Sequence, residues 1–319
     1  MMPFFHAAPR FMRLAAGVLG VLCCLGSALP AAAQEARPKL YAKWLFSHDT
    51  DDFDEIRTTL GYLYANGFGF GIDAAHYRAP GWSATGSGVS ALYLANQEGQ
   101  RLEGALGVAR TNGRDALTGM LDYERRVSEK ATVGVSLERN IVDSVESIER
   151  GITYNAAMLV ADYRFTPRFN VGLAGGAFWF SDDNRRPILR TRWNWELIPD
   201  SGINLYLKTR HYRNTRPYLR HYYAPDSLRE ASLGLSARRA LSRSVVFFAS
   251  ADAGRQSVDH EIDNNIWSFR IGLQSRYPRA PLQWRIALEA SNNSSNWADG
   301  GGEDYRYYSL GGYLLIPLE

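Results

Sequence analysis

Charged and polar side chains recur at every second position in several segments of this chain. In RTRWNWEL, residues 190–197, arginine, asparagine and glutamate occupy the even positions, and threonine, tryptophan and leucine the odd ones. Successive side chains of a strand point to opposite faces, so one face would be charged and the other aromatic and apolar. An arginine-rich face offers donors to oxygen acceptors and stacks on rings. The pattern therefore favours a binding surface, and the apolar face would meet either a soluble core or lipid.

Other segments also carry polar side chains at every second position. This pattern predicts that one face of each strand lines a water-filled interior. Bases gather near residues 190, 204, 268 and 283, and acids gather in segments across from them. Such a wall can bond the hydroxyls of a sugar polymer and stack its rings. The alternative is that opposite charges on neighbouring strands pair and only brace the wall. The residues expected to line the substrate path are Arg190, Arg192, Asn194, Glu196, Tyr206, Lys208, Arg210, Tyr212, Arg270, Gln274, Arg285, Glu289, Asp122, Glu124, Glu138 and Asp252.

Motifs for catalysis or metal binding are missing from the sequence. It contains no G-x-S-x-G elbow, no H-E-x-x-H and no P-loop. The acidic run DTDDFD, residues 49–54, lacks the glycine and closing glutamate of an EF-hand, so a solvated loop is favoured over a Ca²⁺ site. We expect no catalytic residue, no metal and no cofactor, and therefore no enzyme. The histidines that remain are scattered along the chain: His48, His76, His211, His221 and His260.

Period-two alternation is the main secondary-structure signal, and it predicts an all-β protein. Most alternating segments are longer than the usual 5 or 6 residues of soluble strands and match the roughly 9–11 residues of a tilted membrane strand. Their even number suits an antiparallel up-and-down transmembrane barrel. About sixteen strands are expected, near 39–47, 53–65, 68–78, 86–96, 100–110, 116–127, 130–140, 152–165, 168–180, 187–198, 202–213, 228–239, 243–255, 265–277, 281–291 and 304–317.

The links between these segments alternate in length, as the periplasmic turns and extracellular loops of outer-membrane barrels do. Every second link is a tight turn, of which Asn66-Gly67 is the strongest hairpin signal. Longer polar loops are expected at the other end of the barrel: 79–85, 141–151, 181–186, 214–227, 256–264 and 292–303. Clusters of aromatic residues near strand ends, such as 178–180 and 305–308, suit an interfacial girdle. The segment 211–229, rich in Tyr, Arg and His, would constrict the pore, bind a partner outside, or form a solvated loop.

The first 33 residues differ from the rest. Arg10 and Arg13 precede an apolar run that ends in Ala31-Ala32-Ala33, which predicts a cleaved signal peptide over 1–33 and a barrel over 34–319; the alternative is an N-terminal membrane anchor. Both cysteines lie in that leader, so no disulfide is expected in the barrel. The whole chain is nearly balanced, with 36 basic and 33 acidic residues, which argues against nucleic acid as a partner. We expect a bacterial outer-membrane protein in contact with the lipid bilayer.

The chain resembles the C-terminal barrel of bacterial exopolysaccharide export porins, the exporters of poly-N-acetylglucosamine and cellulose. The likeness rests on the leader, the strand number and the Tyr/Arg-rich loop followed by DSLRE and ASLGL, residues 226–235. It implies a conduit for a secreted polysaccharide chain. Family exporters carry periplasmic TPR repeats that this chain lacks, so a separate periplasmic scaffold or an inner-membrane synthase complex is the implied partner. A general or solute-selective diffusion porin and a non-conducting structural or adhesive barrel are the alternatives.

Overall fold

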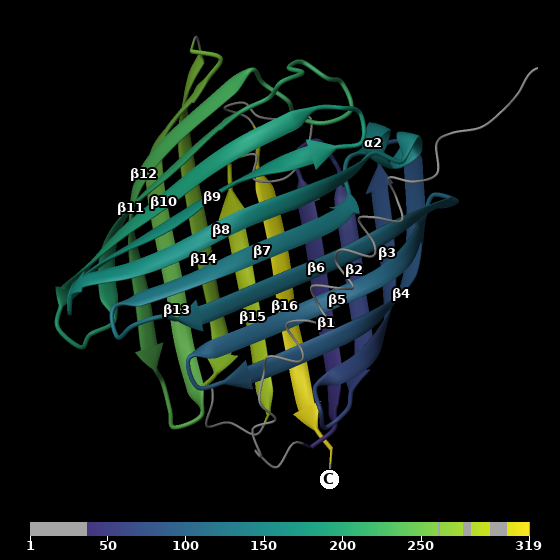
Figure 1. Cartoon of the computed structure of the whole chain (residues 1–319). Helices are drawn as coiled ribbons and strands as arrows, with labels where there is room; N and C mark the ends of the chain where they lie inside the picture. The colour runs from purple at the N-terminus through teal and green to yellow at the C-terminus, as the bar shows by residue number, and fades with distance from the viewer. Residues whose placement is uncertain (1–36, 261, 277–281, 294–304, 319) are drawn as a thin grey trace, which may run out of the picture. The chain divides into compact units, whose positions relative to one another are not determined.

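The computed structural model describes residues 37–260, 262–276, 282–293 and 305–318; the expected signal peptide lies outside them. In the described residues the chain forms sixteen strands and one short helix (Figure 1). The elements are β1 (Lys39–Asp49), β2 (Asp54–Leu63), β3 (Phe68–Ala79), β4 (Trp82–Gln97), β5 (Gln100–Thr111), β6 (Arg114–Arg126), β7 (Ala131–Ile141), α2 (Val145–Arg150), β8 (Thr153–Thr166), β9 (Phe169–Phe180), β10 (Arg185–Ile198), β11 (Ile203–Arg213), β12 (Ser227–Ala240), β13 (Val245–Val258), β14 (Ile262–Ser275), β15 (Gln283–Ser291) and β16 (Tyr307–Pro317).

The strands close into a barrel in which every strand pairs antiparallel with its neighbours in the sequence. The first and last strands complete the ring, and their register runs from Lys39 opposite Pro317 to Asp49 opposite Tyr307. Closure satisfies the backbone donors and acceptors that an edge strand would leave open. The expected sixteen-stranded up-and-down barrel is therefore confirmed. None of the helices among the described residues is long and apolar enough to span a bilayer.

The outer face of the barrel is apolar and exposed. Leu159 is 68% exposed, Ile72 57% and Leu173 46%, and the tryptophans of RTRWNWEL, Trp193 and Trp195, lie on the same face. Exposed apolar side chains on one parity of successive strands form the lipid-facing band of a membrane barrel. The alternative of a soluble core for this face is excluded, because a core would bury it.

Aromatic rings gather on this outer face at the end of the barrel that carries the short turns. On β8 to β10, Phe165 stacks on Phe169 with centroids 5.5 Å apart, and Phe169 stacks on Trp195 at 4.9 Å. Tyr62 and Phe70 stack in the same way on β2 and β3, at 6.0 Å. Rings at this height suit the membrane interface, where the amphipathic Tyr and Trp side chains are favoured.

The girdle expected at residues 178–180 and 305–308 is only partly correct. Phe178 and Phe180 face the interior, where Phe180 is 5% exposed within a buried cluster, while Trp179 between them faces outward at 40%. Tyr305 is buried as well, at 4%, whereas Tyr308 is exposed. An aromatic residue at a strand end belongs to the girdle only when its parity is outward, because the inward parity meets the loops that fold into the mouth.

Two of the expected long loops are tight turns. The pairing of β3 with β4 continues to Ala79 opposite Trp82, and a two-residue turn with Gly81 at φ 71° closes it. The pairing of β13 with β14 continues to Val258 opposite Ile262. The predictions for 79–85 and 256–264 were wrong because polar residues there continue the ladder beyond the membrane, where both faces meet water.

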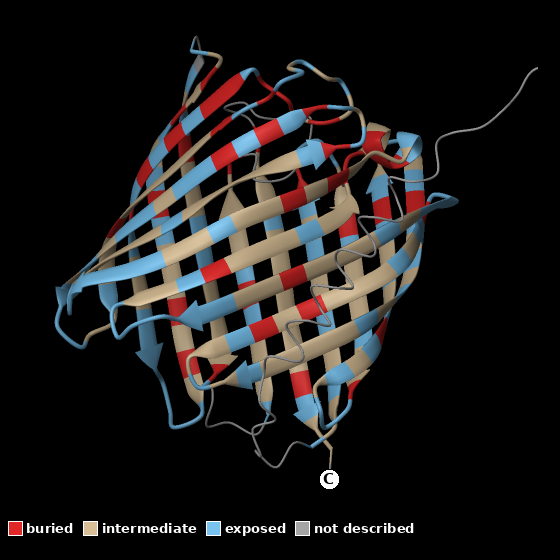
Figure 2. Cartoon of the chain, in the orientation of Figure 1, coloured by how far each residue is buried: buried red, intermediate tan, exposed pale blue. Residues whose placement is uncertain are grey.

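The expected loop 141–151 contains the helix α2. Ser144 caps its N-terminus, where its side chain accepts a hydrogen bond from the backbone N–H of Ser147, and Gly151 ends it in the left-handed conformation. Glu146 in the first turn and Arg150 in the last complement the helix dipole. Figure 2 shows buried positions around α2 and the adjoining strand ends, so this loop packs on the barrel.

Candidate functional site

The sixteen residues expected to line the substrate path all lie on the inner face. Each falls on the parity opposite to the exposed apolar residues of its strand, and the registers bring these positions side by side on neighbouring strands. Their use as a path for a substrate stays a prediction. Their contacts divide them into members that brace the wall and members whose charge faces the lumen.

Two basic residues of β11, Lys208 and Arg210, are braced by acids. Arg210 donates through Nε and Nη2 to the two carboxylate oxygens of Glu230 at 2.7 and 2.6 Å, and both side chains are largely buried. Lys208 Nζ lies 2.7 Å from Asp252. The same carboxylate accepts a hydrogen bond from the hydroxyl of Tyr206 at 2.8 Å. These contacts fit the bracing interpretation for Lys208, Arg210 and Asp252.

Arg192 has a different environment. Its Nε donates to Asn194 at 2.9 Å, and its guanidinium lies over the ring of Tyr206, 3.9 Å from the centroid. Asn194 in turn donates to Asn170 at 2.8 Å. A guanidinium stacked on a tyrosine keeps its outer edge free for an acceptor in the lumen.

The remaining predicted residues are spread around the ring. Arg270 pairs with Glu289, Arg285 lies over the ring of Phe248 at 4.6 Å, and Glu138 accepts a hydrogen bond from Tyr154 at 2.7 Å. Tyr212 is buried beside Ile188 and Leu228, and Gln274 accepts from Arg238. Asp122, Glu124 and Glu196 share the inner parity without an ion pair to a described residue. The structure therefore brings the bases of β10 and β11 together and does not bring the acids into one cluster.

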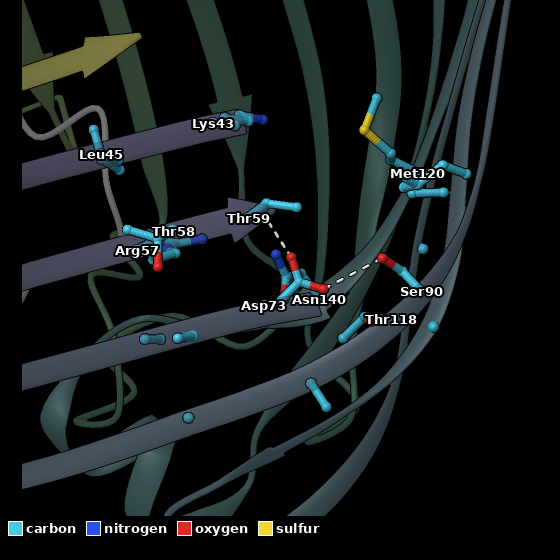
Figure 3. Close-up of a pocket in the computed structure, with 18 of the residues that line it drawn as sticks. Lys43, Leu45, Arg57, Thr58, Thr59, Asp73, Ser90, Thr118, Met120 and Asn140 are labelled. Carbon is cyan, nitrogen blue, oxygen red and sulfur yellow. Dashed lines mark hydrogen bonds between the residues drawn. The ribbon is translucent and has the colours of Figure 1, made fainter. Parts of the chain in front are cut away.

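The wall formed by β1 to β7 lines a cavity of about 370 Å³ (Figure 3). Asp73 of β3 sits at its centre and accepts hydrogen bonds from Thr59 at 2.7 Å and Ser90 at 3.3 Å, one from each neighbouring strand. Lys43 and Asn140 also line this space. Hydroxyl, carboxylate, amine and amide groups here give the lumen a second polar wall.

Two loops cover part of the mouth, and we call residues 142–152 and 214–226 together the mouth bridge. In the first loop, Ile148 of α2 is 1% exposed and packs on Tyr77 of β3 and Ala84 of β4. Asp143 reaches Arg57 of β2, whose Nη2 lies 2.7 Å from its carboxylate. The loop between β7 and β8 is therefore fixed to β2, β3 and β4, which are not its neighbours in the barrel.

The second loop folds inward from β11 and β12. Tyr222 is fully buried, and its ring stacks on Phe180 with centroids 4.6 Å apart. Its hydroxyl accepts a hydrogen bond from Asn184 at 3.1 Å and lies 3.1 Å from the carboxylate of Asp182. Burial raises the pKa of Tyr222 well above its usual range, so the hydroxyl stays a donor at ordinary pH. Arg186 Nη2 donates to the carbonyl of Tyr223 at 2.5 Å. Of the three expectations for segment 211–229, inward folding is the one that the structure shows.

The two loops of the mouth bridge are bonded to each other. The hydroxyls of Ser144 and Ser147 donate to the backbone carbonyl of His221, the second at 2.7 Å, and the His221 ring lies 3.1 Å from Glu146. Serine, histidine and glutamate meet here, but the serine hydroxyls are bound to a carbonyl and not to the imidazole. The arrangement is therefore structural and does not activate a nucleophile.

The acidic run 49–54 uses its carboxylates within the chain. Asp49 accepts hydrogen bonds from the backbone N–H groups of Asp51 and Phe53, both at 3.0 Å, and Asp54 pairs with His48 and Arg78. In the part of the chain that the structure describes, His, Cys, Asp and Glu residues form no group of three that could hold a metal. The carboxylates of this run order the β1–β2 turn.

Sequence reasoning missed several residues of this interior. Glu230 shares the inward parity of β12 and faces Arg210, so the strand pattern could have identified it. Arg57 and Asp143 lie 86 positions apart, and no local pattern predicts their pairing. Asn293, which accepts a hydrogen bond from Arg210 at 3.1 Å, lies beyond the end of β15 and carries no sequence signal of this contact.

Comparison with known proteins shows similarity in fold. No protein-family model and no curated protein matches the chain. A solved structure described as a bacterial polysaccharide outer membrane secretin has a TM-score of 0.65 at 14% identity, and the match covers 90% of this chain and 100% of that one. CdiB from Acinetobacter baumannii matches with a TM-score of 0.49 at 11% identity, over 89% of this chain and 61% of that one. Pseudomonas aeruginosa OccK5 matches at 0.42 and 12%, over 89% and 98%. The closed ring, its apolar outer face and the fold shared with the first of these structures make this chain an outer-membrane β-barrel.

Proposed function

We propose that the barrel is an outer-membrane channel that conducts a secreted polysaccharide. The observation that carries the proposal is the inner wall of β9 to β11, where Arg192 stacks on Tyr206 beside the amides of Asn194 and Asn170. Planar donors, amides and a ring on one wall are the groups that bond sugar hydroxyls and stack on sugar rings. The fold similarity to a polysaccharide outer membrane secretin supports the same proposal.

A channel of this kind works by many weak contacts. Conduction requires sites that are favourable enough to enter and weak enough to leave. Ion pairing in the wall contributes to this balance. The acids of the Arg210–Glu230 and Lys208–Asp252 pairs hold the basic side chains in place and neutralise part of their charge, so that a ligand is bound less tightly. A sliding chain would exchange hydrogen bonds with successive groups along the wall and with lumen water.

A diffusion porin for small solutes is the second candidate, and the mouth bridge favours it. Its loops contact β2, β3 and β4 at one side and β8, β9 and β10 at the other, so they narrow the entrance. A narrowed entrance admits small solutes without rearrangement, whereas a polymer has to pass beside the bridge or displace it.

The test is export from cells that depend on this barrel. Arg190→Ala combined with Arg192→Ala removes two lumen arginines that have no carboxylate partner among the described residues, while Arg210 is kept because its loss would leave Glu230 uncompensated. We expect secreted polysaccharide to fall while the protein stays folded, as judged by its heat-dependent migration in detergent gels. Arg229→Ala, an exposed residue on the outward parity of β12, is the matched control. If the double variant exports polysaccharide as the wild type does but takes up small solutes more slowly, the polysaccharide conduit is refuted and the diffusion porin is the better account.

A further inference from the structure

Four basic side chains form a square on the inner wall of β10 and β11. Arg190 lies directly opposite Arg210 in the register, and Arg192 lies opposite Lys208. Like charges on directly opposed positions destabilise a sheet. The square is therefore a local conflict in an otherwise consistent strand pattern, and such conflicts are expected where a protein has a ligand to bind. We call these four residues the basic square.

Among the described residues, acids neutralise the positive charge of the basic square on its β12 side only. Glu230 and Asp252, on β12 and β13, neutralise Arg210 and Lys208. On the other side, the β9 residues opposite Arg190 and Arg192 are Ala174 and Gly172, which carry no charge.

The two β10 arginines of the basic square, Arg190 and Arg192, have no carboxylate partner among the described residues. In the described part of the chain Arg190 has no hydrogen bond or ion pair, and Arg192 bonds to Asn194 and stacks on Tyr206. Asp162 of β8 is the nearest acid on the β9 side; it lies beyond Gly172 in the register and forms no ion pair with a described residue. Arg190 and Arg192 are both exposed to the lumen. Their charge is therefore available to an anion that enters from the lumen.

The small residues of β9 leave space beside these arginines. Gly172 and Ala174, with Val160 of β8, line a recess of about 400 Å³ together with the basic square. Ser232 and Asn293 add a hydroxyl and an amide to its lining, and the carboxylate of Glu230, which is bound to Arg210, lies there as well. Replacing the small side chains by large ones would fill the space, so the recess depends on their size.

A buried tyrosine hydroxyl lies on the side of the recess that faces the mouth bridge. The oxygen of Tyr223, in the mouth bridge, is buried and has no hydrogen-bond partner among the described residues. Its ring packs on the cluster of Ile188 and Tyr212, two positions along the same strands from Arg190 and Arg210. This buried donor has no acceptor in the described part of the chain, and Tyr223 does not itself line the recess.

We propose that this recess binds an acidic sugar unit, one that carries a carboxylate, and that the channel accordingly prefers a polyanionic glycan. The inference rests on the proposed polysaccharide conduit and names the chemical class of its substrate. A carboxylate accepts two parallel hydrogen bonds from one guanidinium, so Arg190 and Arg192 would each offer it a planar fork. The anion would also relieve the repulsion within the basic square.

The test compares the block of single channels in planar bilayers by three hexamers of equal length: hexagalacturonate, which is anionic, maltohexaose, which is neutral, and a glucosamine hexamer, which is cationic. We expect hexagalacturonate to block at the lowest concentration. Raising KCl from 0.1 to 1 M should weaken its block, because the Debye length falls from about 10 to about 3 Å, and should leave maltohexaose unaffected.

Variants locate the effect. Arg190→Gln combined with Arg192→Gln should weaken hexagalacturonate block about tenfold, since a hydrogen bond to a charged group contributes roughly that factor, and should leave maltohexaose block nearly unchanged. Arg238→Gln removes one charge from the inward parity of β12 outside the recess. Compared with Arg190→Gln and Arg192→Gln taken singly, which also remove one charge each, it should preserve the preference that they weaken.

The outcomes separate this inference from the proposed function. Steady channels that the glucosamine hexamer or maltohexaose blocks best would overturn the acidic-sugar site and keep the conduit. Equal loss of block in the recess and control variants would also overturn the site, because it would show a diffuse charge effect. Steady channels that no hexamer blocks would overturn the conduit itself.

Discussion

Tyr222 should hold the second loop of the mouth bridge in place, and Tyr222→Ala should release it. The side chain is fully buried, its ring stacks on Phe180 at an interplanar angle of 18°, and its hydroxyl contacts Asn184 and Asp182. Truncation of a buried aromatic side chain costs about 3–5 kcal/mol. Because barrel closure does not depend on this loop, that cost should fall on docking of the loop and raise its undocked fraction by about 10²-fold to several 10³-fold.

Trypsin cleavage after Arg220 measures the undocked fraction. The side chain of Arg220 is exposed, but the backbone of the next residue, His221, is fixed by the serine hydroxyls of the first loop, so cleavage requires the loop to open. When opening is fast relative to cleavage, the cleavage rate follows the open population. Tyr222→Ala in lipid vesicles should therefore be cut about 10²-fold faster than the wild type or more.

Tyr218→Ala is the matched control, because it removes the same side chain from the same loop at a position that is 69% exposed. It should change the cleavage rate little, since exposed substitutions usually stay within about 0.5 kcal/mol. Equal cleavage of the wild type and Tyr222→Ala would refute the reasoning, because it would mean that the Phe180 contact does not hold the loop.

Two further predictions concern the orientation of the strand faces and the buried ion pair of the inner wall. Trp193→Lys should impair assembly in vesicles, since a lysine on the lipid face costs up to roughly 2–4 kcal/mol and less toward the interface, while Asn194→Lys on the inner face should assemble normally. Equal tolerance of both lysines would contradict the assigned faces. Glu230→Ala should lower the free energy of unfolding in urea by about 3 kcal/mol, because it leaves Arg210 buried without its partner. The same change at Glu289, whose ion pair is exposed, should cost at most about 1 kcal/mol, and similar losses at both sites would argue against burial as the cause.

The strands and the orientation of their faces could be predicted because a membrane wall imposes a strict two-residue period. Trp193 and Asn194 are adjacent in the chain and face different media, so the alternation records the environment of each residue directly. This logic fails beyond the membrane, where both faces meet water. Residues 79–85 and 256–264 were for that reason expected as loops although they continue the strands.

The mouth bridge is the part that the sequence could not predict. Its contacts join residues far apart in the chain, such as Asp143 to Arg57 and Ser147 to His221, and they depend on shapes that form only after the barrel has closed. The sequence predicted one feature of the basic square, because parity placed its four bases on the inner face. The absence of an acid opposite Arg190 became evident only with the register of β9.

Conductance of the purified protein in a planar lipid bilayer, with and without soluble sugar oligomers, tests the central claim most directly. A polysaccharide conduit predicts steady channels that the oligomers block reversibly, because the chain segments occupy the hydrogen-bonding wall of β9 to β11. Steady channels that are indifferent to sugars would contradict the conduit in favour of a diffusion porin. Folded protein that forms no channels would contradict both and show that the mouth bridge closes the barrel.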